Sequence, residues 1–589
     1  MKLPAGKWRN ISLTPCMNKL VKDIFPVTDW GRRYSATDFR ADTIAGLVVL
    51  FITIPQVIAY AFLAGMPAEA GLYACLMSLV GYAAFGSSRS LAVGPTAIVA
   101  MMTLEAASHY HLPGETGYTE VVVQLSVVTG LVLISLRVIN FGSVISFLSH
   151  AVVTGFITAA AILIISNQFP LMIGLPSAND TSMLGVYRYL FASVSGYNLT
   201  VVTISLGAVL LLVFCRVWLG GLLLRLGLRD SLADSLVKSA PMYAVVLGIL
   251  LIGLIPADMA GRVAVVGDVP GSLPHVSVVF MSLERMLQLL PSAFLIAMVV
   301  FMESTSIGTA IASKSRDKIN PNQELVGLGA ANLGSSIVGG FPVAGSFARS
   351  IVNFSSGAVS QVASLVTASL VLVTLVLFAS AFHDLPKGVL SAIIVVSAWQ
   401  LIDPSAIRKI FEFNRTDAVT FSTTFLAVLA FGVETGVLTG IAISFLLLIR
   451  KSSKPHIAVV GRVGDSEHFR NVNRFDVTTS PRVLAVRVDE SFYFVNTRHI
   501  ENFILAQIAD SREIEHVLVI CTAANFIDTS GLEMLEELSE NLQEVGVTLH
   551  LAEVKSPVMD KLRETGFYKN MAGQVFFTTD LAMKELADI

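Results

Sequence analysis

Charged residues are scarce in this chain. Only 14% of its 589 residues are Asp, Glu, Lys or Arg, whereas about 25% is usual for a soluble globular protein. Hydrophobic residues make up 54% of the chain, and the mean hydropathy is +0.71. The net charge of −3 offers no basic footprint for binding a nucleic acid. The composition excludes an ordinary soluble protein and predicts a protein that crosses a lipid membrane several times.

Cysteine is also rare, and the four cysteines lie far apart in the sequence, at Cys16, Cys75, Cys215 and Cys521. None belongs to a CxxC pair or a Cys/His cluster, so the sequence indicates neither a zinc site nor a disulfide framework. The ten histidines are scattered, and the chain has no metal-binding or nucleophile-elbow motif. We therefore expect no enzyme activity, no metal and no cofactor.

The few charges are distributed unevenly along the chain. They are sparse from Thr43 to Ile449 and reach an ordinary density from Arg450 onward. The N-terminal segment is basic but lacks the apolar core of a signal peptide, so we expect it to be retained. This pattern predicts four parts: a cytosolic N-terminal segment at 1–42, a transmembrane domain at 43–450, a linker and the start of the last domain at 451–481, and a soluble domain at 482–589.

Apolar runs long enough to span a bilayer recur through the transmembrane part. Together with shorter, glycine-interrupted pieces they amount to about fourteen segments. Most lysines and arginines of the short loops fall on the side that also holds the N-terminus. The positive-inside rule therefore places both termini in the cytosol of a multi-pass protein, in a plasma membrane or an inner membrane.

Two segments broken by glycine and proline occupy similar places in the two halves of this region. One opens with Val93-Gly94-Pro95-Thr96 and the other with Gly340-Phe341-Pro342-Val343. Such a pair is expected in an inverted repeat, here 42–256 and 288–450, whose binding site lies between the halves. The start of a half-helix directs free backbone N–H groups and the positive end of the helix dipole at one point, which suits an anion. The alternative is that these residues only kink packed helices.

After residue 482 the pattern becomes that of a small soluble α/β domain. A helix is indicated by leucines at helical spacing between Gly531 and Gln543. Asp528-Thr529-Ser530-Gly531 lies just before it, where the two hydroxyl groups are able to cap the helix. The predicted strands are Val483–Asp489, Ser491–Val495, His516–Cys521 and Val547–Leu551.

Several separated motifs resemble the sulfate permease family, which includes the animal solute-carrier-26 anion exchangers. They are Pro67–Pro95, Gly267–Pro274 and Ser346–Asn353, while Asp528-Thr-Ser-Gly resembles the signature of the STAS domain that this family carries. The resemblance implies seven plus seven transmembrane segments in an inverted repeat, with a core domain that moves against a gate domain. It also implies a homodimer and a small inorganic anion as substrate.

The candidate anion site joins the two half-helix starts. Small residues there allow backbone N–H groups to approach an anion closely. Arg349 follows in the same stretch, and a guanidinium inside the bilayer costs at least ~2.5–3.5 kcal/mol, so it calls for a partner or a task. We expect it to attract an oxyanion through several donors; the alternative is a snorkelling residue at the end of a short segment. The substrate-binding candidates at these starts are Thr96, Ala97, Gly345, Ser346, Phe347, Ala348 and Arg349.

Gln56 and Tyr60 are further substrate-binding candidates. They are four residues apart and so lie on one helix face, beside Pro55, which we expect to break the helix. Gln56 offers amide donors, and Tyr60 offers a ring and a hydroxyl group. Polar packing between helices is the alternative. The resemblance implies that these positions line the pocket.

Glu303 is the candidate for ion coupling. It is a lone carboxylate in an apolar segment, where its charged form is disfavoured. This suits a proton-coupling site or a charge relay with Arg349, and a fixed ion pair with Arg349 is the alternative. The family places an acidic residue here, and some members bind sodium with a hydroxyl group four residues later, where this chain has Ile307. The departure favours H+ over Na+, although Thr305 and Ser306 also carry oxygens.

The expected function is secondary active transport of an inorganic oxyanion. Sulfate is the first choice, because Ser346–Asn353 and Glu303 resemble the plant and microbial sulfate-transporting branch. The alternatives are bicarbonate or dicarboxylate transport, an uncoupled chloride exchanger or channel, and a sensor whose STAS domain passes on a signal. In the STAS domain, similarity to bacterial anti-sigma antagonists makes Thr529 and Ser530 candidate phosphosites. The expected partners are membrane lipid, a second copy of the chain, and a regulatory protein or nucleotide at the STAS domain.

Overall fold

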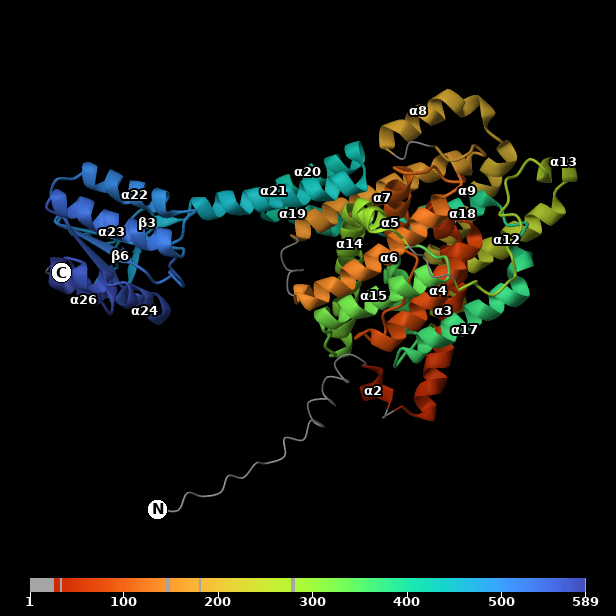
Figure 1. Ribbon diagram of the computed structural model, residues 1–589, viewed down its shortest axis with the longest axis horizontal. Coiled ribbons are helices and arrows are strands. Elements are labelled where there is room, and N and C mark those ends of the chain that lie inside the picture. The colour runs from red at the N-terminus through yellow and green to blue at the C-terminus, as the bar shows by residue number, and fades with distance from the viewer. Residues whose placement is uncertain (1–25, 32–33, 143–148, 179–181, 277–280, 588–589) are drawn as a thin grey trace, which may run out of the picture. The chain divides into compact units, whose positions relative to one another are not determined.

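The computed structural model describes residues 26–31, 34–142, 149–178, 182–276 and 281–587 (Figure 1). Most of the predicted segment 1–42 falls outside these ranges, as does Cys16. The chain divides into two compact units, the first ending at Ile441 and the second beginning at Ala442. The two units are described separately.

The first unit consists of helices and one very short strand pair. Its α-helices are α2 (Val27–Trp30), α3 (Ala36–Leu63), α4 (Ala68–Phe85), α5 (Ala97–Ser108), α6 (Tyr118–Val138), α7 (His150–Met172), α8 (Met183–Ser193), α9 (Leu199–Phe214), α10 (Gly220–Arg225), α11 (Asp230–Lys238), α12 (Ala240–Leu254), α13 (Ala257–Ala260), α14 (Leu283–Ser315), α15 (Pro321–Ile337), α16 (Phe347–Ser355), α17 (Val362–Phe378), α18 (Lys387–Trp399), α19 (Pro404–Phe413), α20 (Arg415–Phe431) and α21 (Val433–Ser453). The shorter elements are η3 (Val194–Gly196), η4 (Cys215–Leu219), η5 (Ala379–Phe382), β1 (Val93–Gly94) and β2 (Ala344–Gly345).

The helices of this unit match a membrane protein. Among the described residues, nine helices are long and apolar enough to cross a bilayer, and ten if the bent pair Leu232–Lys238 and Ala240–Leu254 forms one span. Two of the predicted segments, α5 and α16, have only 12 and 9 residues, and a span needs about 20. The nine apolar helices confirm the multi-pass helical fold. The count of about fourteen segments stays a prediction, because α5 and α16 are too short to span a bilayer alone.

Helix α3 runs unbroken through Pro55, so the expected break beside Gln56 and Tyr60 is wrong. The helix begins with a capping box in which Ser35 and Asp38 satisfy each other's backbone N–H groups. It packs against α4 and α17 over much of its length. Neighbouring helices allow a proline inside a membrane helix, because they offer hydrogen-bond partners to the backbone group that the proline leaves without one.

The interior of the first unit is packed through small residues. Helix α15 lies against both α4 and α6. A Cβ atom on Gly81 would lie 2.7 Å from the carbonyl oxygen of Ala330, and one on Gly329 would lie 3.0 Å from the carbonyl oxygen of Gly130. Helices without a strong hydrophobic drive to associate gain from such close backbone approach. The glycines therefore set the spacing of α15 from α4 and from α6.

The second unit is an α/β domain built on a six-stranded sheet. The strand order is β4-β3-β5-β6-β7-β8, antiparallel at β4, β3 and β5 and parallel from β5 onward. The buried strands β5 and β6 are almost entirely apolar, as expected for a sheet covered on both faces. The elements are β3 (Ile457–Arg462), β4 (Phe469–Asn471), β5 (Val483–Val488), α22 (Thr497–Ala509), β6 (His516–Ile520), α23 (Thr529–Glu544), β7 (Thr548–Ala552), α24 (Ser556–Glu564), α25 (Phe567–Asn570), β8 (Val575–Phe576) and α26 (Thr579–Ala587).

One sequence prediction for this domain needs correction. Residues Ser491–Val495 form no strand; only Phe492 makes an isolated bridge, to Ile527. The stretch 451–481, predicted as linker and the start of the last domain, contains β3 and β4, which belong to the sheet. Strand β4 has no buried residue, and its pattern therefore carried no alternating apolar signal.

Candidate anion site

The two half-helix starts meet through a pair of two-residue strands. Val93 pairs with Gly345 and Gly94 with Ala344 in antiparallel register. The N–H of Ser346 donates to the carbonyl of Ala92 at 3.0 Å, which extends the pairing by one bond. Helix α5 begins just after β1, and α16 begins just after β2. Two helix N-termini that lie far apart in the sequence are thereby brought to one place.

Several N–H groups at these starts already have partners. The N–H of Gly345 donates to Ser304 Oγ at 2.8 Å, and the N–H of Arg349 donates to Ser346 Oγ at 3.5 Å. Helix geometry gives the first N–H groups of α16, those of Phe347 and Ala348, no intrahelical acceptor. The candidate backbone donors of this helix for an anion are therefore the N–H groups of Phe347 and Ala348, two and three residues beyond Gly345.

A cavity of about 180 Å³ lies at the two helix starts. Its wall comes from α3, α5, α14 and α16, with further residues from η4 and the end of α18. The sequence candidates on the wall are Gln56, Tyr60, Thr96, Ala97, Glu303, Ser346, Phe347 and Ala348. The wall residues that sequence reasoning missed are Ile98, Arg216, Ser397, Gln400 and Leu401. Gly345 and Arg349 do not line this cavity.

Three polar side chains on this wall have buried atoms without a protein partner in the described part of the chain. They are Gln56 Oε1, Thr96 Oγ1 and Glu303 Oε2. Thr96 is the N-cap of α5, yet its hydroxyl makes no capping bond. Buried polar groups are nearly always hydrogen-bonded, so three such atoms around one cavity call for water or a polar ligand as their partner.

Arg349 lies behind the cavity rather than on it. Its side chain is only 1% exposed; Nη2 donates to the carbonyl of Pro95 at 2.6 Å, and Nη1 lies 4.0 Å from Cys75 Sγ. The snorkelling alternative is therefore wrong. Within the described ranges Arg349 forms no ion pair with Glu303, so the fixed-pair alternative also fails. A Cβ on Gly94 would lie 2.8 Å from Arg349 Nη1, which explains the glycine there.

Arg216 is the cation that does line the cavity. It belongs to η4, a π-helical stretch between α9 and α10, and such stretches are rare and frequently functional. Arg216 and Lys238 also line an adjoining cavity of about 270 Å³. The residues common to both cavities are Gln56, Arg216, Phe347, Ala348, Ser397 and Gln400. Arg216 looked like an ordinary loop cation in the sequence, because a π turn leaves no clear pattern there.

In the second unit, the helix cap at α23 differs from the predicted one. Asp528 is the N-cap, and its Oδ1 accepts from the N–H of Gly531 at 2.8 Å. Its Oδ2 accepts from the N–H of Phe494 at 2.9 Å. The expected capping by Thr529 and Ser530 is therefore wrong, and Thr529 is exposed at the first helical position.

The structure is that of a multi-pass membrane protein with a polar cavity at two half-helix starts, followed by a small α/β domain. The model of the Sulfate permease family matches residues 39–424, more than half of the chain, and that of the STAS domain matches residues 474–582. The chain belongs to the sulfate permease family. This family is made up of membrane transporters, not enzymes.

Relatives of known name cover nearly the whole chain. "Sulfate transporter 1.3" of Arabidopsis thaliana is 30% identical over 575 residues, which are 95% of this chain and 86% of that protein. "High affinity sulfate transporter 2" of Stylosanthes hamata is 28% identical and covers 94% of this chain and 85% of that protein.

Two solved structures show the same fold. The murine Solute Carrier 26 family member A9 anion transporter, in the inward-facing state, has a TM-score of 0.86 at 21% identity, over 99% of this chain and 96% of that one. The transmembrane domain of the cyanobacterial bicarbonate transporter BicA has a TM-score of 0.58 at 20% identity, over 70% of this chain and 98% of that one.

Proposed function

We propose that this protein carries sulfate across a cell membrane by proton-coupled secondary active transport. The observation that carries the proposal is the cavity at the paired half-helix starts, with its three unpartnered polar atoms. The names of its plant relatives support sulfate as the substrate. The family membership supports anion transport in general.

The substrate is held mainly by backbone donors and helix dipoles. The N–H groups of Phe347 and Ala348, together with those at the start of α5, suit the oxygens of a sulfate dianion. Arg349 adds positive charge from behind the site and keeps the two starts together. Arg216 lies at the junction of the two cavities, where it attracts the anion before it reaches the helix starts.

Coupling to protons rests on Glu303. Its carboxylate is on the cavity wall, and Oε2 has no partner among the described residues. A proton on this carboxylate removes one negative charge from the site when a dianion enters. Ile307 offers no oxygen at the position where some relatives carry a hydroxyl group, so we place Na+ second. Motion of a core domain, which includes α5 and α16, against a gate domain then exposes the site to each side in turn.

Further parts of the proposal concern the assembly. We propose a homodimer with both termini in the cytosol of a plasma or inner membrane, and a regulatory partner at the STAS domain. The exposed Thr529, or Ser530 beside it, is a phosphorylation site in this proposal, since a phosphate at a helix N-terminus is favoured by the dipole. Mass spectrometry of the native protein tests this, and absence of phosphate under varied growth conditions counts against it.

The decisive experiment measures labelled sulfate uptake into proteoliposomes with an imposed proton or sodium gradient. We expect accumulation with the proton gradient and its loss in Glu303→Gln, while sulfate exchange at equilibrium persists. Glu284→Gln, on the same helix but exposed and away from the cavity, is the control. Uptake driven by sodium alone contradicts proton coupling. A stronger response to bicarbonate, chloride or dicarboxylates in the same vesicles contradicts the sulfate assignment.

A further inference from the structure

Another polar cavity lies at the C-terminal end of α14, the helix that carries Glu303 in its interior. Its volume is about 310 Å³, and it shares no lining residue with the anion site. Three segments form it: the loop after α4, the end of α14 with the following loop, and the end of α16. The positive-inside pattern assigns the two loops to the cytosol. The lining residues are Ser87, Ser88, Arg89, Ser90, Ile311, Ala312, Ser315, Arg316, Asp317, Lys318, Ile319, Phe354, Ala358 and Val359.

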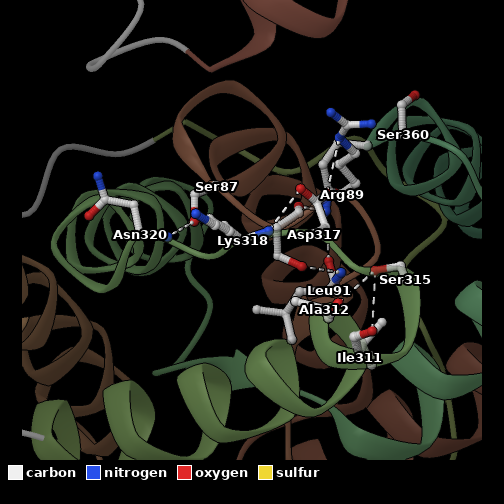
Figure 2. A network of polar contacts seen from close by, with 12 residues as sticks. Ser87, Arg89, Leu91, Ile311, Ala312, Ser315, Asp317, Lys318, Asn320 and Ser360 are labelled. Carbon is white, nitrogen blue, oxygen red and sulfur yellow. Dashed lines mark hydrogen bonds and ion pairs between the residues drawn. The ribbon is translucent and has the colours of Figure 1, made fainter.

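Positive charge predominates on the wall of this cavity. Arg89, Arg316 and Lys318 face a single carboxylate, that of Asp317. Arg89 Nε lies 3.4 Å from Asp317 Oδ2, and both side chains are about half exposed (Figure 2). Exposed pairs of this kind bind weakly and leave the cation available. Arg316 and Lys318 make no ion pair within the ranges that the structure describes.

Arg316 has a backbone conformation that is unfavourable for a residue with a Cβ atom. It is the C-cap of α14 in the left-handed conformation, with φ 56° and ψ 31°. The N–H groups of Arg316 and Asp317 both donate to the carbonyl of Ala312. Glycine or asparagine is favoured at such a helix end, because a Cβ atom is crowded there. An outlier of this kind at a cavity points to a role for its side chain.

The loop on the other side of the cavity is held in place by buried amide and carboxylate groups. Glu324 is fully buried and accepts from Ser87 Oγ at 2.6 Å and from the N–H groups of Ser87 and Ser88 at 2.9 and 3.1 Å. Ser87 Oγ also accepts from the N–H of Asn320 at 3.2 Å (Figure 2). Gln361 Nε2 donates to the carbonyls of Ser88 and Leu91. The cavity wall is thus preformed.

This loop leads directly into the anion site. It continues into β1 at Val93 and then into the start of α5 at Ala97. The opposite wall is the end of α14, which carries Glu303 farther along the same helix. A ligand that bridges the loop and the helix end therefore contacts both elements that carry transport residues.

We propose that this cavity is a regulatory site for a tetrahedral oxyanion, either free phosphate or sulfate, or the phosphate of a lipid headgroup. The guanidinium of Arg316 and the ammonium of Lys318 bind its oxygens, and the hydroxyl of Ser315 lies on the same wall. Occupancy links the end of α14 to the loop before α5 and changes the rate of sulfate transport.

The test uses the full-length chain and compares three proteins. The variant carries Arg316→Gly and Lys318→Gln; the glycine removes the charge while suiting the left-handed conformation, so the helix end is kept. The control is Lys314→Gln, which removes a nearby exposed charge from the same helix without touching the cavity. Equilibrium dialysis with labelled inorganic phosphate measures binding in micelles. Any binding at the transport site is common to all three proteins, so their difference reports this cavity.

The two sources of the oxyanion give different results. If the ligand is free in solution, phosphate affinity falls about tenfold or more for each cation removed, and the control keeps the parent value. If it is a lipid headgroup, sulfate transport in vesicles of phosphatidylglycerol differs from that in phosphatidylcholine, and only the double variant loses the difference. A double variant that equals the parent in both measurements overturns the proposal. Should it fail to elute as a folded protein, Lys318→Gln alone decides by the same criteria.

Discussion

The guanidinium of Arg349 donates to the carbonyl oxygen of Pro95 at 2.6 Å, and this contact adds a side-chain bond to the β1–β2 pairing that joins the two half-helices. Arg349 is in the first turn of α16, and Pro95 lies two residues before α5. The side chain that looked most like a direct anion ligand is instead buried between the two half-helices that we propose bind the anion. Its charge acts on the site from behind, in surroundings where electrostatic effects are strong.

Arg349→Ala is expected to weaken both the fold around the site and the binding of sulfate. The carbonyl of Pro95 loses its donor, which costs about 1–3 kcal/mol for a buried group. Arg349→Lys keeps the charge but not the planar set of donors, so it restores binding only in part. Sulfate titration and thermal unfolding of the purified protein measure the two effects, with exposed Arg408→Ala as control. Unchanged sulfate affinity in Arg349→Ala would refute the role of its charge.

Arg216→Gln is expected to raise KM for sulfate more than it lowers kcat. Arg216 lines both cavities and attracts the anion on its way to the helix starts. The effect should shrink at high ionic strength, because salt screens an exposed charge. Initial rates of sulfate uptake at several salt concentrations measure it. Arg225→Gln, in the last turn of α10 and away from both cavities, serves as control; an equal effect there means that only overall charge matters.

The contact between Glu105 and Val433 is a second place where elements distant in the sequence are held together. Glu105 Oε2 accepts from the N–H of Val433 at 2.9 Å, at the start of α21. The preceding Gly432 has φ 88°, and a Cβ atom there would overlap the Glu105 carboxylate. Gly432→Ala should therefore lower thermal stability more than Gly207→Ala, where a Cβ meets no atom within 4 Å. A loss in Gly432→Ala no larger than that in Gly207→Ala would contradict the tight fit of the backbone at Gly432.

His550 is expected to make the free energy of unfolding of the second unit depend on pH. Burial, aided by the charge of His516 nearby, lowers the pKa of His550 from 6.5 to about 4. The unfolded chain therefore binds a proton that the folded domain excludes, and stability falls as the pH drops from 6.5 toward 4. The loss reaches about 3 kcal/mol.

Urea unfolding of residues 454–589, which follow α21 and hold the core of the second unit, measures this loss at several pH values. The variant His550→Gln should remove most of the pH dependence in that window. If it keeps the parent profile, His550 is not the group responsible.

Much of the architecture could be read from local patterns. Scarce charge and long apolar runs predict the membrane domain, and the Gly/Pro breaks near Pro95 and Pro342 predict the two half-helices. Such local patterns do not predict which elements pack against one another. Pro55 lies inside an intact helix that packs against α4 and α17, and β4 joins the sheet through its pairing with β3 rather than through an apolar pattern of its own.

By itself the sequence determined that this chain is a multi-pass membrane protein with an α/β domain at its end, and it located most of the cavity wall. Hydropathy, helix breaks and family motifs depend on residues close together in the chain, so the sequence alone reveals them. Only the tertiary structure decided that Arg349 lies behind the cavity and that Arg216 and Gln400 line it. It also decided that the N–H of Gly345 donates to Ser304 Oγ. Those roles depend on which face of each helix packs against its neighbours. Contacts between residues far apart in the chain determine that face.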